Sequence, residues 1–355
     1  MSSPDTINLP PPLPWPDHAD EAKKAGIYIP PSGIYFRLVN YFSNHVLVSR
    51  NTGISFKAEV WHHPSSEVFE DQWFEFVHAG YGARYGLVAI KGKKSGKVLF
   101  SRGGGDPCLG HTDGDGKYND NWFTIEPGTG KYAKTFRLYP PSTNRAIVSR
   151  LHTQPEVFNH PKDDVHSDHH WSYMFDFEDM QIDKVEYALD EGRIIRQVPV
   201  ILADKVLPNK TSATQTLTLE VNERVMHTSE FRYEFGINFK VGVQFKAGIP
   251  FVGEKGDLSF GLSSSSKWTW GKSDSTEKAW RVTFTVVAPP GKTVYATAVV
   301  SHGELEVPYT IFVSSKSTGV KTETKGIWRG VSSWNLRYSP LEVDDSGDSV
   351  MHAPV

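Results

Sequence analysis

Cysteine is almost absent from this sequence, and this removes one source of stability. Cys108 is the only cysteine among 355 residues, so no disulfide can form within the chain. Packing must therefore stabilise the fold in any compartment. Cys108 lies in a Gly/Pro-rich stretch without an evident positioned base, which argues against a cysteine nucleophile.

Long apolar runs and an excess of one charge are missing too. No apolar run is long enough for a membrane-spanning helix, and the start of the chain has no apolar signal-peptide core. We therefore expect a protein that is made soluble and is released or secreted by a non-classical route. The formal net charge of −3 predicts no nucleic-acid partner.

Helical periodicity is almost absent outside residues 17–26, whereas aromatic residues make up 12% of the chain and glycine and proline are frequent. This composition predicts an all-β fold. The proline-rich start predicts a flexible arm over residues 1–26, and the acidic end predicts a loose tail over residues 341–355.

A repeat with a period near 49 residues occupies the first half of the chain. Three near copies of one apolar segment are each followed by a long polar loop that ends in tryptophan. The copies are VLVSR at 46–50, VLFSR at 98–102 and AIVSR at 146–150, and the tryptophans are Trp73, Trp122 and Trp171. One such unit cannot bury its own apolar face, so three units predict a closed β-trefoil over residues 27–177. We expect one tryptophan from each unit to pack in its core.

The polar loops before these tryptophans contain groups that bind sugars. Carboxylates, amides and imidazoles hydrogen-bond sugar hydroxyls beside an aromatic face. The 49-residue offset aligns His111 with His160 and Asp115 with Asp164. The first repeat has His62 but Ser66 in place of the acid, so we expect its loop to be incomplete.

The third loop allows a different chemistry, which is metal binding. Its candidate ligands are His166, His169, His170, Asp163, Asp164 and Asp168. Their irregular spacing on one loop and the lack of cysteine ligands argue against a metal site. The DGDG sequence at 113–116 is similar to a calcium loop but lacks the following ligands and the closing glutamate.

Residues 236–271 predict a β-hairpin with one apolar face. Apolar residues alternate with polar residues and glycine along both arms. They are Ile237, Phe239, Val241, Val243, Phe245, Ala247 and Ile249 on the first arm and Leu258, Phe260 and Leu262 on the second. The first arm is long enough to cross a bilayer as part of an oligomeric barrel. The same alternation is found in antiparallel strands that cover a water-soluble core, so this alternative stays open.

Long strands rich in serine and threonine flank the hairpin within residues 178–340. We expect them over residues 211–235, 278–287, 293–300 and 306–316. Their length exceeds that of ordinary sandwich strands. The hairpin therefore interrupts two long strands, which suits a segment that must leave its resting place.

Nearly the whole chain, from Ile27 to about Ser339, resembles the aerolysin-like haemolytic lectins of fungi, of the type found in Laetiporus. The matching stretches occur in collinear order. They are IYIPPSGIYFRL from Ile27, GKVLFSR from Gly96, DGDGKYNDNWFTIEPG from Asp113, FNHP from Phe158, FEDMQIDKVEY from Phe177, FKAGIP from Phe245, KWTWGK from Lys267 and ELEVPYTIFVSSKSTG from Glu304.

This resemblance implies a trefoil that binds terminal galactose or N-acetyllactosamine glycans and a β-domain that forms a homo-oligomer and inserts a hairpin barrel into the target-cell membrane. It implies neither a cofactor nor an enzymatic activity. By position, one site comprises His111, Asp115, Asn119, Asp120 and Asn121, and the other comprises His160, Asp164, Asp168, His169 and His170. The second site departs from the pattern, because His169-His170 stands in place of the acid–amide pair of the other repeats.

Two other functions are alternatives to this one. A lectin that agglutinates or serves storage or defence, without lysing cells, would use the second half only for oligomerisation. A glycan-active enzyme would need two carboxyl groups about 5–10 Å apart in a cleft. The second half offers only scattered acids such as Glu220, Glu230 and Glu234, so we expect no enzyme.

Overall fold

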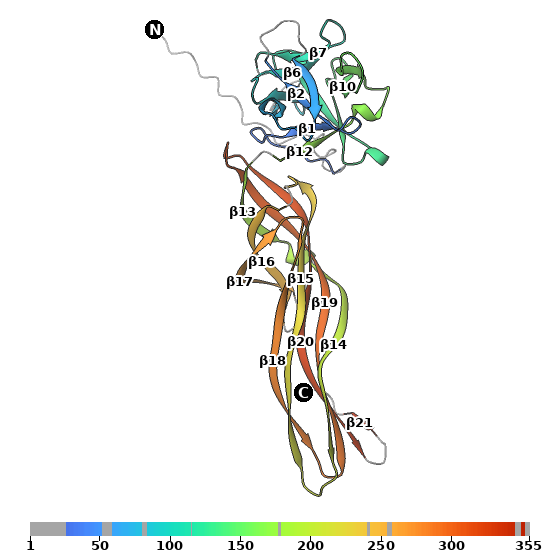
Figure 1. Ribbon diagram of the computed structural model, residues 1–355, viewed down its shortest axis with the longest axis vertical. Coiled ribbons are helices and arrows are strands. Elements are labelled where there is room, and N and C mark those ends of the chain that lie inside the picture. Colours follow the sequence, from blue (N-terminus) through green and yellow to red (C-terminus); the bar gives the residue numbers. More distant parts are fainter. Residues whose placement is uncertain are drawn as a thin grey trace, which may run out of the picture. The chain divides into compact units, whose positions relative to one another are not determined.

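The computed structural model describes residues 26–51, 59–79, 84–114, 116–176, 179–239, 242–253, 258–344 and 349–351 (Figure 1). The arm expected over residues 1–26 lies outside these ranges except for Gly26. The chain forms two compact units. The first comprises Met1–Asp183, Phe235–Lys240 and Phe312–Thr324, and the second comprises Lys184–Glu234, Val241–Ile311 and Lys325–Val355.

The first unit contains three repeats of four strands, with a short 3₁₀ turn between the third and fourth strand of each. The first repeat has β1 (Arg37–Asn40), β2 (His45–Ser49), β3 (Val60–Pro64), η1 (Glu70–Gln72) and β4 (Phe74–His78). The second has β5 (Val88–Gly92), β6 (Val98–Ser101), β7 (Leu109–Thr112), η3 (Asn119–Asn121) and β8 (Trp122–Pro127). The third has β9 (Phe136–Tyr139), β10 (Arg145–Ser149), β11 (Val157–Pro161), η5 (Ser167–His169) and β12 (Trp171–Met174). A further turn, η4 (Gly130–Tyr132), precedes β9.

Antiparallel pairing closes these repeats into a β-trefoil, as predicted. The second and third strands of each repeat form hairpins, and β4 pairs with β5, β8 with β9 and β12 with β1. The last pairing joins the final repeat to the first, so no repeat has to bury its apolar face alone. The near-copy segments of the sequence are the buried second strands β2, β6 and β10.

The spacing of the repeats differs from the sequence prediction. The strand registers pair Leu47 with His62, Leu99 with His111 and Ile147 with Asn159. Along the third strands the structural period is therefore 49 residues and then 48, so the expected equivalence of His111 with His160 is wrong.

This one-residue difference also changes the core. Phe74, Phe123 and Trp171 occupy equivalent positions in the main apolar cluster of the trefoil. Trp122 is buried in a separate small cluster, and Trp73 is buried beside the guanidinium of Arg37. The expectation that all three tryptophans share the core therefore fails for Trp73 and Trp122. Because the third repeat is one residue shorter here, Trp171 lies at the position of Phe74 and Phe123.

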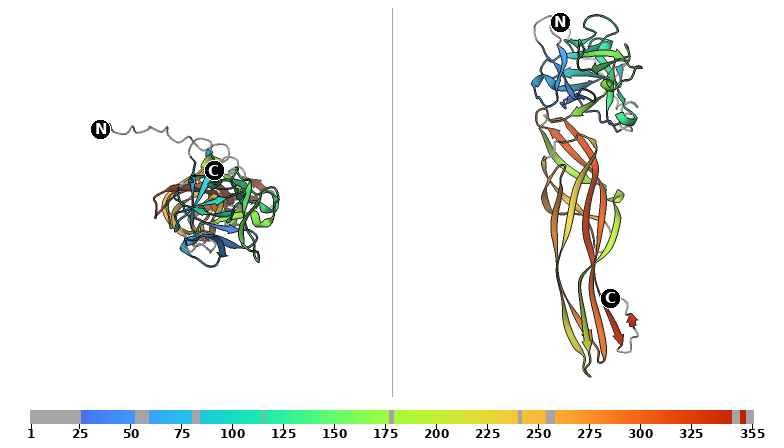
Figure 2. Two further views of the ribbon diagram at one scale, coloured as in Figure 1. Left: turned by 90° about the horizontal axis from the view of Figure 1, so that it is seen from above. Right: turned by 45° about the vertical axis from the view of Figure 1, so that its right-hand side comes forward.

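Long strands form the second sheet, and they run side by side in both side-on views (Figures 1 and 2). Their order is β13-β19-β20-β15-β18, with β14 on β19 and β21 on β20. Their bounds are β13 (Met180–Tyr187), β14 (Arg193–Asn209), β15 (Gln215–Gly236), β18 (Ser273–Ala288), β19 (Lys292–Ser315), β20 (Lys321–Asp344) and β21 (Ser349–Met351), and η6 (Leu189–Glu191) precedes β14. In the described parts of the chain, no helix has the length and apolarity needed to span a membrane.

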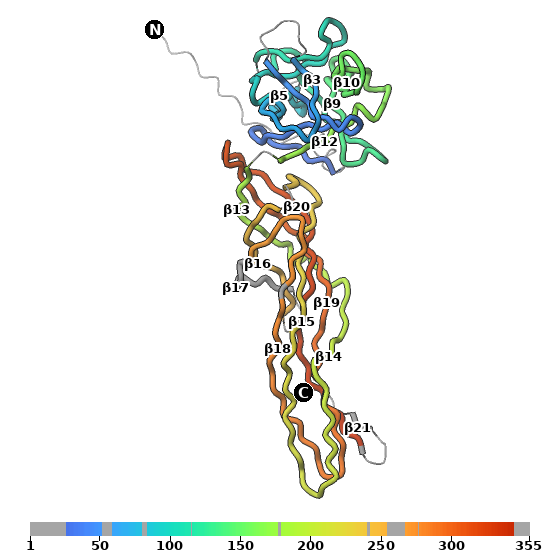
Figure 3. Tube along the Cα trace, viewed as in Figure 1, coloured from blue at the N-terminus to red at the C-terminus, as the bar shows by residue number. Residues whose placement is uncertain are grey.

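The sequence predicted four strands here, and the structure merges two of them. The strands expected over residues 293–300 and 306–316 are one continuous strand, β19, which can be followed in Figure 3. The tail prediction is wrong for residues 341–344, because the end of β20 pairs there with β21 through Leu341 and Met351. Leu341 and Met351 are both apolar, and apolar residues favour a strand over a loose tail.

The predicted hairpin is present, but its first arm is shorter than the alternation suggests. β16 (Gln244–Val252) pairs with β17 (Leu258–Thr269), whereas residues 237–239 belong to no strand. Phe245 and Ala247 are buried, but beyond an irregularity after Ala247 the buried positions become Pro250 and Val252. Ile249 is only half-buried because the buried face of β16 changes from odd to even positions at this irregularity.

The remaining hairpin residues of the prediction are placed as follows. Ile237 and Phe239 are buried before β16, and Val243 is half-buried. Leu258, Phe260 and Leu262 lie in β17 by their backbone. Val241 lies outside the described residues.

Candidate functional site: the polar loops of the trefoil and the hairpin

Each repeat of the trefoil holds one aspartate of its 3₁₀ turn against the arginine that follows its second strand. The Nε atoms of Arg50, Arg102 and Arg150 donate to Oδ2 of Asp71, Asp120 and Asp168 at 2.5, 2.9 and 2.6 Å. The other oxygen of each aspartate is buried and accepts no hydrogen bond from the described residues. Buried polar atoms are seldom left without a partner, so this threefold feature indicates a place where ligand hydroxyls could bind.

A second set of arginines, which the sequence analysis missed, fixes the polar loops. Arg84 donates to the carbonyl oxygens of Gly116 and Lys117 and to the side chain of Asn119. The guanidinium of Arg37 donates to Ser65 O and Glu67 O, and that of Arg137 donates to Lys162 O. No common spacing relates Arg84 to the other two arginines, and for that reason the repeat alignment could not show them.

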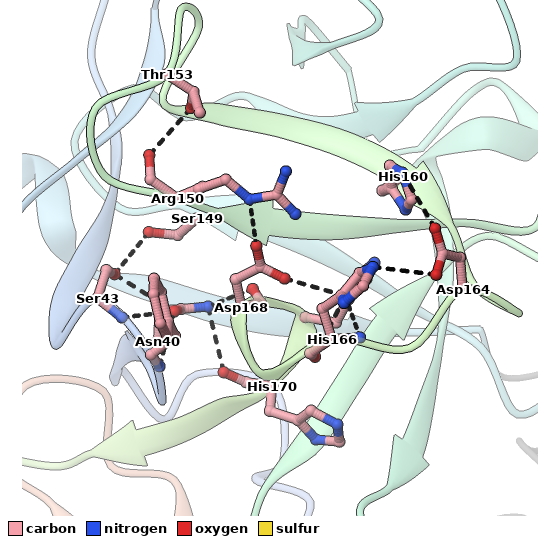
Figure 4. A network of polar contacts seen from close by, with 12 residues as sticks. Asn40, Ser43, Ser149, Arg150, Thr153, His160, Asp164, His166, Asp168 and His170 are labelled. Carbon is pink, nitrogen blue, oxygen red and sulfur yellow. Dashed lines mark hydrogen bonds and ion pairs between the residues drawn. The ribbon is translucent and has the colours of Figure 1, made fainter.

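The third loop places two imidazoles, those of His160 and His166, beside the exposed carboxylate of Asp164, as Figure 4 shows. Nε2 of His166 lies 3.0 Å from Oδ1 of Asp164, and Nε2 of His160 lies 3.7 Å from Oδ2. The rings of His160, His166 and His169 are mutual neighbours, with centroids 5.4 to 6.1 Å apart. Asp164 is 60% exposed, so its oxygens also face solvent.

His169 lies behind this pair, and its ring is fully buried. Its Nδ1 is 3.0 Å from the backbone N–H of His166 and 3.2 Å from Oδ1 of Asp168. Its Nε2 is buried without a hydrogen-bond partner in the described part of the chain. Burial lowers the pKa of His169 to about 4, although Asp168 opposes the shift.

His170 packs its ring flat against Tyr132, with centroids 4.0 Å apart. The hydroxyl of Thr135 donates to Tyr132 O, so it accepts a hydrogen bond from Nδ1 of His170 at 3.0 Å. Nε2 of His170 is therefore the unprotonated ring nitrogen, and no described residue donates a hydrogen bond to it. Burial first, and then Arg137, lower the pKa of His170 to about 4.

His111, predicted to bind sugar, instead links two repeats inside the fold. Its Nδ1 bonds Ser49 Oγ at 2.7 Å, and its Nε2 bonds Glu59 Oε2 at 2.7 Å. His62 bonds Ser149 and Glu156 in the same way. Burial lowers the pKa of both histidines. Both ring nitrogens of His111 are used, so this part of the site prediction is wrong.

The other predicted residues of the second loop have different roles. Asn121 is buried, accepts from Tyr118 N and donates to Leu99 O, so it shapes the turn rather than facing a ligand. Asn119 accepts from Arg84, and Asp120 bonds Arg102. Asp115 lies outside the described residues. The half-exposed ring of Tyr118 is the aromatic surface of this loop.

The first loop is more complete than the sequence predicted. His63 and Glu67 form a pair at 3.7 Å with the same i,i+4 spacing and distance as His160 and Asp164. Its acid is thus Glu67, one position beyond Ser66. The exposed rings of Trp61 and Phe69 both neighbour the His63 ring, with centroids 4.9 and 5.2 Å from it.

The corrected spacing also revises the third repeat. The aspartate of each 3₁₀ turn is followed by Gln72, Asn121 and His169 in turn. The third repeat therefore keeps the acid, as Asp168, and replaces only the amide. No group of three His, Cys, Asp or Glu side chains in the described ranges is arranged to hold a metal ion.

The second half of the molecule shows which protein family the chain belongs to. Residues 160–344 match the family model of the Clostridium epsilon toxin ETX and the Bacillus mosquitocidal toxin MTX2, which is more than half of the 355 residues. The chain belongs to the ETX/MTX2 toxin family. The predicted relationship to aerolysin-like toxins is thereby confirmed at the level of this family. The specific relationship of this chain to the fungal haemolytic lectins stays a prediction. A comparison with curated proteins found no match.

Three solved structures show what else the chain is similar to. The β-trefoil of BEL has 34% identity and a TM-score of 0.37 over 41% of this chain and 94% of its own. The lamprey immune protein has 14% identity and a TM-score of 0.36 over 88% and 91% of the two chains. An aerolysin-like protein of Bombina maxima has 12% identity and a TM-score of 0.33 over 45% and 96%.

Membership of the ETX/MTX2 family gives the chain an aerolysin-like toxin domain in addition to its trefoil. Within this domain the hairpin rests on aromatic contacts. Phe231 of β15 packs against Phe245 and Trp268, with centroids 4.9 and 5.9 Å away. Tyr187 donates a hydrogen bond to Gly248 O at 2.7 Å.

The segment that leads into the hairpin is bound to β20 through the side chain of Thr324. The hydroxyl of Thr324 accepts from Ile237 N at 3.1 Å and donates to Ile237 O at 2.8 Å. Thr324 and Ile237 are both fully buried. This contact holds residues 237–239 outside the strand pattern that their alternation would otherwise favour.

Proposed function

We propose that this ETX/MTX2-family chain is a pore-forming, haemolytic lectin. Its trefoil loops bind terminal galactose or N-acetyllactosamine glycans on target cells, copies of the chain then associate, and the hairpin inserts as part of a shared β-barrel. The observation that carries the proposal is the family match over residues 160–344, which contain an amphipathic hairpin between two long strands.

The loop geometry supports glycan binding at the trefoil. Each repeat presents a buried, partly unbonded carboxylate beside an arginine, and the first and third loops add an exposed histidine–acid pair. An exposed aromatic ring completes the first and second loops, as Phe69 and Tyr118. Carboxylates beside aromatic faces suit the hydroxyl and C–H sides of a sugar ring.

Insertion requires residues 237–243 to extend the hairpin arm. In the structure this arm is interrupted because Ile237 is bonded to Thr324 and β16 begins only at Gln244. An extended arm of 237–249 would have the length and the alternation of a transmembrane β-strand, with its backbone paired to neighbouring copies. Separation of Ile237 from Thr324 is therefore a step that insertion needs.

A reversible crosslink tests this step. The substitutions Ile237→Cys and Thr324→Cys, in a Cys108→Ser background, place two cysteines where a side-chain oxygen now lies 3.1 Å from a backbone nitrogen. We expect the oxidised protein to bind vesicles that carry N-acetyllactosamine but to release at least about tenfold less dye, with release restored by reductant.

The single variant Ile237→Cys in the same background is the matched control, and its dye release should not respond to reductant. Thiol titration shows whether the crosslink has formed. Undiminished release by the fully crosslinked protein would contradict insertion of this arm. Agglutination of red cells without lysis by the unmodified protein would instead favour a non-lytic lectin.

A further inference from the structure

The third loop differs from the second in carrying imidazoles where the second has residues that do not titrate near neutral pH. His160 corresponds to Thr112 of the second repeat, and His166 to Tyr118. His169 stands in place of Asn121. The first loop has one imidazole at these positions, His63, which is equivalent to His160. Histidine is the side chain whose charge ordinarily changes between pH 5 and 8, and the third loop has the most such groups at these positions.

Two of these imidazoles flank one carboxylate. His166 meets Oδ1 of Asp164 at 3.0 Å and His160 meets Oδ2, so each oxygen has its own imidazole neighbour. With neutral rings, Asp164 keeps lone pairs that can accept from ligand hydroxyls. With both rings protonated, each becomes a charge-assisted donor to one oxygen, and the local charge changes from −1 to +1.

The buried His169 supplies a further polar group that faces this pair. Its Nε2 is buried without a described partner, and its ring lies 5.4 Å from that of His160 and 5.7 Å from that of His166. A proton on Nδ1 would face Asp168 and His166 O and would displace the hydrogen bond from His166 N. That bond caps the 3₁₀ turn of the loop, and burial lowers the pKa of His169 to about 4, so the cap stays intact in mildly acidic solution while His160 and His166 respond.

We propose that the third repeat is a proton-gated glycan site, in which Asp164 and its flanking histidines hold ligand hydroxyls at neutral pH and release them in mildly acidic solution. The inference rests on the proposed lectin function and names the regulation of one of its sites. The second repeat, with Thr112 and Tyr118 at the equivalent positions, keeps its ligand over the same pH range.

The other charged groups around the loop are already engaged. Arg150 bonds Asp168, and Lys162 bonds Asp163. Arg137, whose charge lowers the pKa of His170, is paired with Glu126. Protonation of His160 and His166 therefore adds positive charge that only Asp164 can compensate.

The test measures binding of the full-length chain to immobilised N-acetyllactosamine at pH 7.4 and pH 5.5. We expect about tenfold weaker binding at pH 5.5, in line with the loss of one or two ligand hydrogen bonds. The double variant His160→Thr/His166→Tyr carries the residues of the second repeat, and its affinities at the two pH values should agree within about twofold.

The matched control is His152→Asn, which removes an exposed imidazole of the third repeat outside the polar loop and should keep the pH response of the unmodified chain. Near-UV circular dichroism at both pH values establishes that each protein is folded, and His166→Tyr alone serves if the double variant is not. Equal binding of the unmodified chain at both pH values would overturn the gate. So would an unchanged response in the folded third-loop variant, or its loss in His152→Asn. Absence of binding by every protein at pH 7.4 would instead count against the lectin function itself.

Discussion

At the scale of single residues, burial determines which histidines of the trefoil serve the fold. His62 and His111 use both ring nitrogens to join neighbouring repeats, whereas His160 and His166 remain partly exposed beside Asp164. The sequence shows the same residue type in all four places. Only the strand register separates structural histidines from those that could meet a ligand.

The buried histidines predict that the fold weakens in acid. The folded pKa values of His169 and His170 are about 4, below the ordinary value of 6.5, so the unfolded chain binds these protons first as the pH falls. The free energy of unfolding should therefore decrease between pH 6.5 and about 4, and Tm should fall by several degrees.

Calorimetry at pH 7.0, 5.5 and 4.5 measures this decrease. The variant His170→Phe keeps a flat ring against Tyr132 but cannot take up a proton, so its Tm should fall less over the same range. An exposed histidine provides the control, because His152→Phe should leave the pH dependence as it is. A Tm that is constant or rises toward acid pH would show that these rings do not titrate as described.

At the scale of strands, close approaches of backbone and side chains control how the long sheet packs. Gly326 of β20 lies so near the carbonyl oxygen of Arg232 and the hydroxyl of Tyr309 that a Cβ atom would collide with both. That hydroxyl donates to the same carbonyl oxygen at 3.2 Å, so it cannot withdraw without losing its partner. A glycine is needed here for space and not for an unusual backbone angle.

The substitution Gly326→Ala should consequently destabilise the second unit by about 1–3 kcal/mol, the ordinary range for overpacking. Chemical unfolding followed by tryptophan fluorescence measures the loss. Gly103→Ala makes the same chemical change at a position with no neighbour within 4 Å, and it should have almost no effect. Equal stability of the two variants would mean that β20 shifts freely to accept the methyl group.

The sequence predicted the elements well because alternation and repeats are local signals. It showed the all-β class, the three repeats, the hairpin and β15, whose strand pattern is uninterrupted. It missed β14, which contains Pro199 and Pro208 and pairs with β19 alone among the named strands. Proline is tolerated at a sheet edge, where one side of the strand needs no donor, but a propensity argument counts it as a break.

The site was harder to predict because it depends on register. A single missing residue moved His160 away from the position of His111 and brought Trp171 to that of Phe123. A fixed period cannot show such a change. The pairs His63–Glu67 and His160–Asp164 could have been found from their shared i,i+4 spacing, whereas the loop-holding arginines could not.

At the scale of the whole molecule, the trefoil carries three equivalent loops, each with an aspartate at the same position of its 3₁₀ turn. Asp71 and Asp168 occupy the same position in the first and third repeats, each bonded to its arginine with one oxygen unbonded by described residues. Sites that act together bind a glycan-bearing membrane with an effective concentration that neither has alone.

Loss of two such sites should therefore cost far more than loss of one. We expect Asp71→Asn and Asp168→Asn each to weaken binding to N-acetyllactosamine vesicles by about tenfold, and the double variant to weaken it by about a hundredfold or more. Flotation with the vesicles measures binding, and the protein concentration needed for lysis should rise in parallel. The exposed Asp163→Asn is the control. A double variant no worse than either single one would argue for one working site.

The hydrogen bonds of His111, His62 and Asn159 run in a circle. Each of these side chains takes its serine from the preceding repeat around the ring: Ser49 for His111, Ser101 for Asn159 and Ser149 for His62. Cutting the trefoil open at another junction and joining its former ends would leave every one of these links intact. Deleting a whole repeat would leave one serine and one histidine or asparagine side chain without their hydrogen-bond partners. The trefoil should therefore tolerate circular permutation far more readily than a reduction to two repeats.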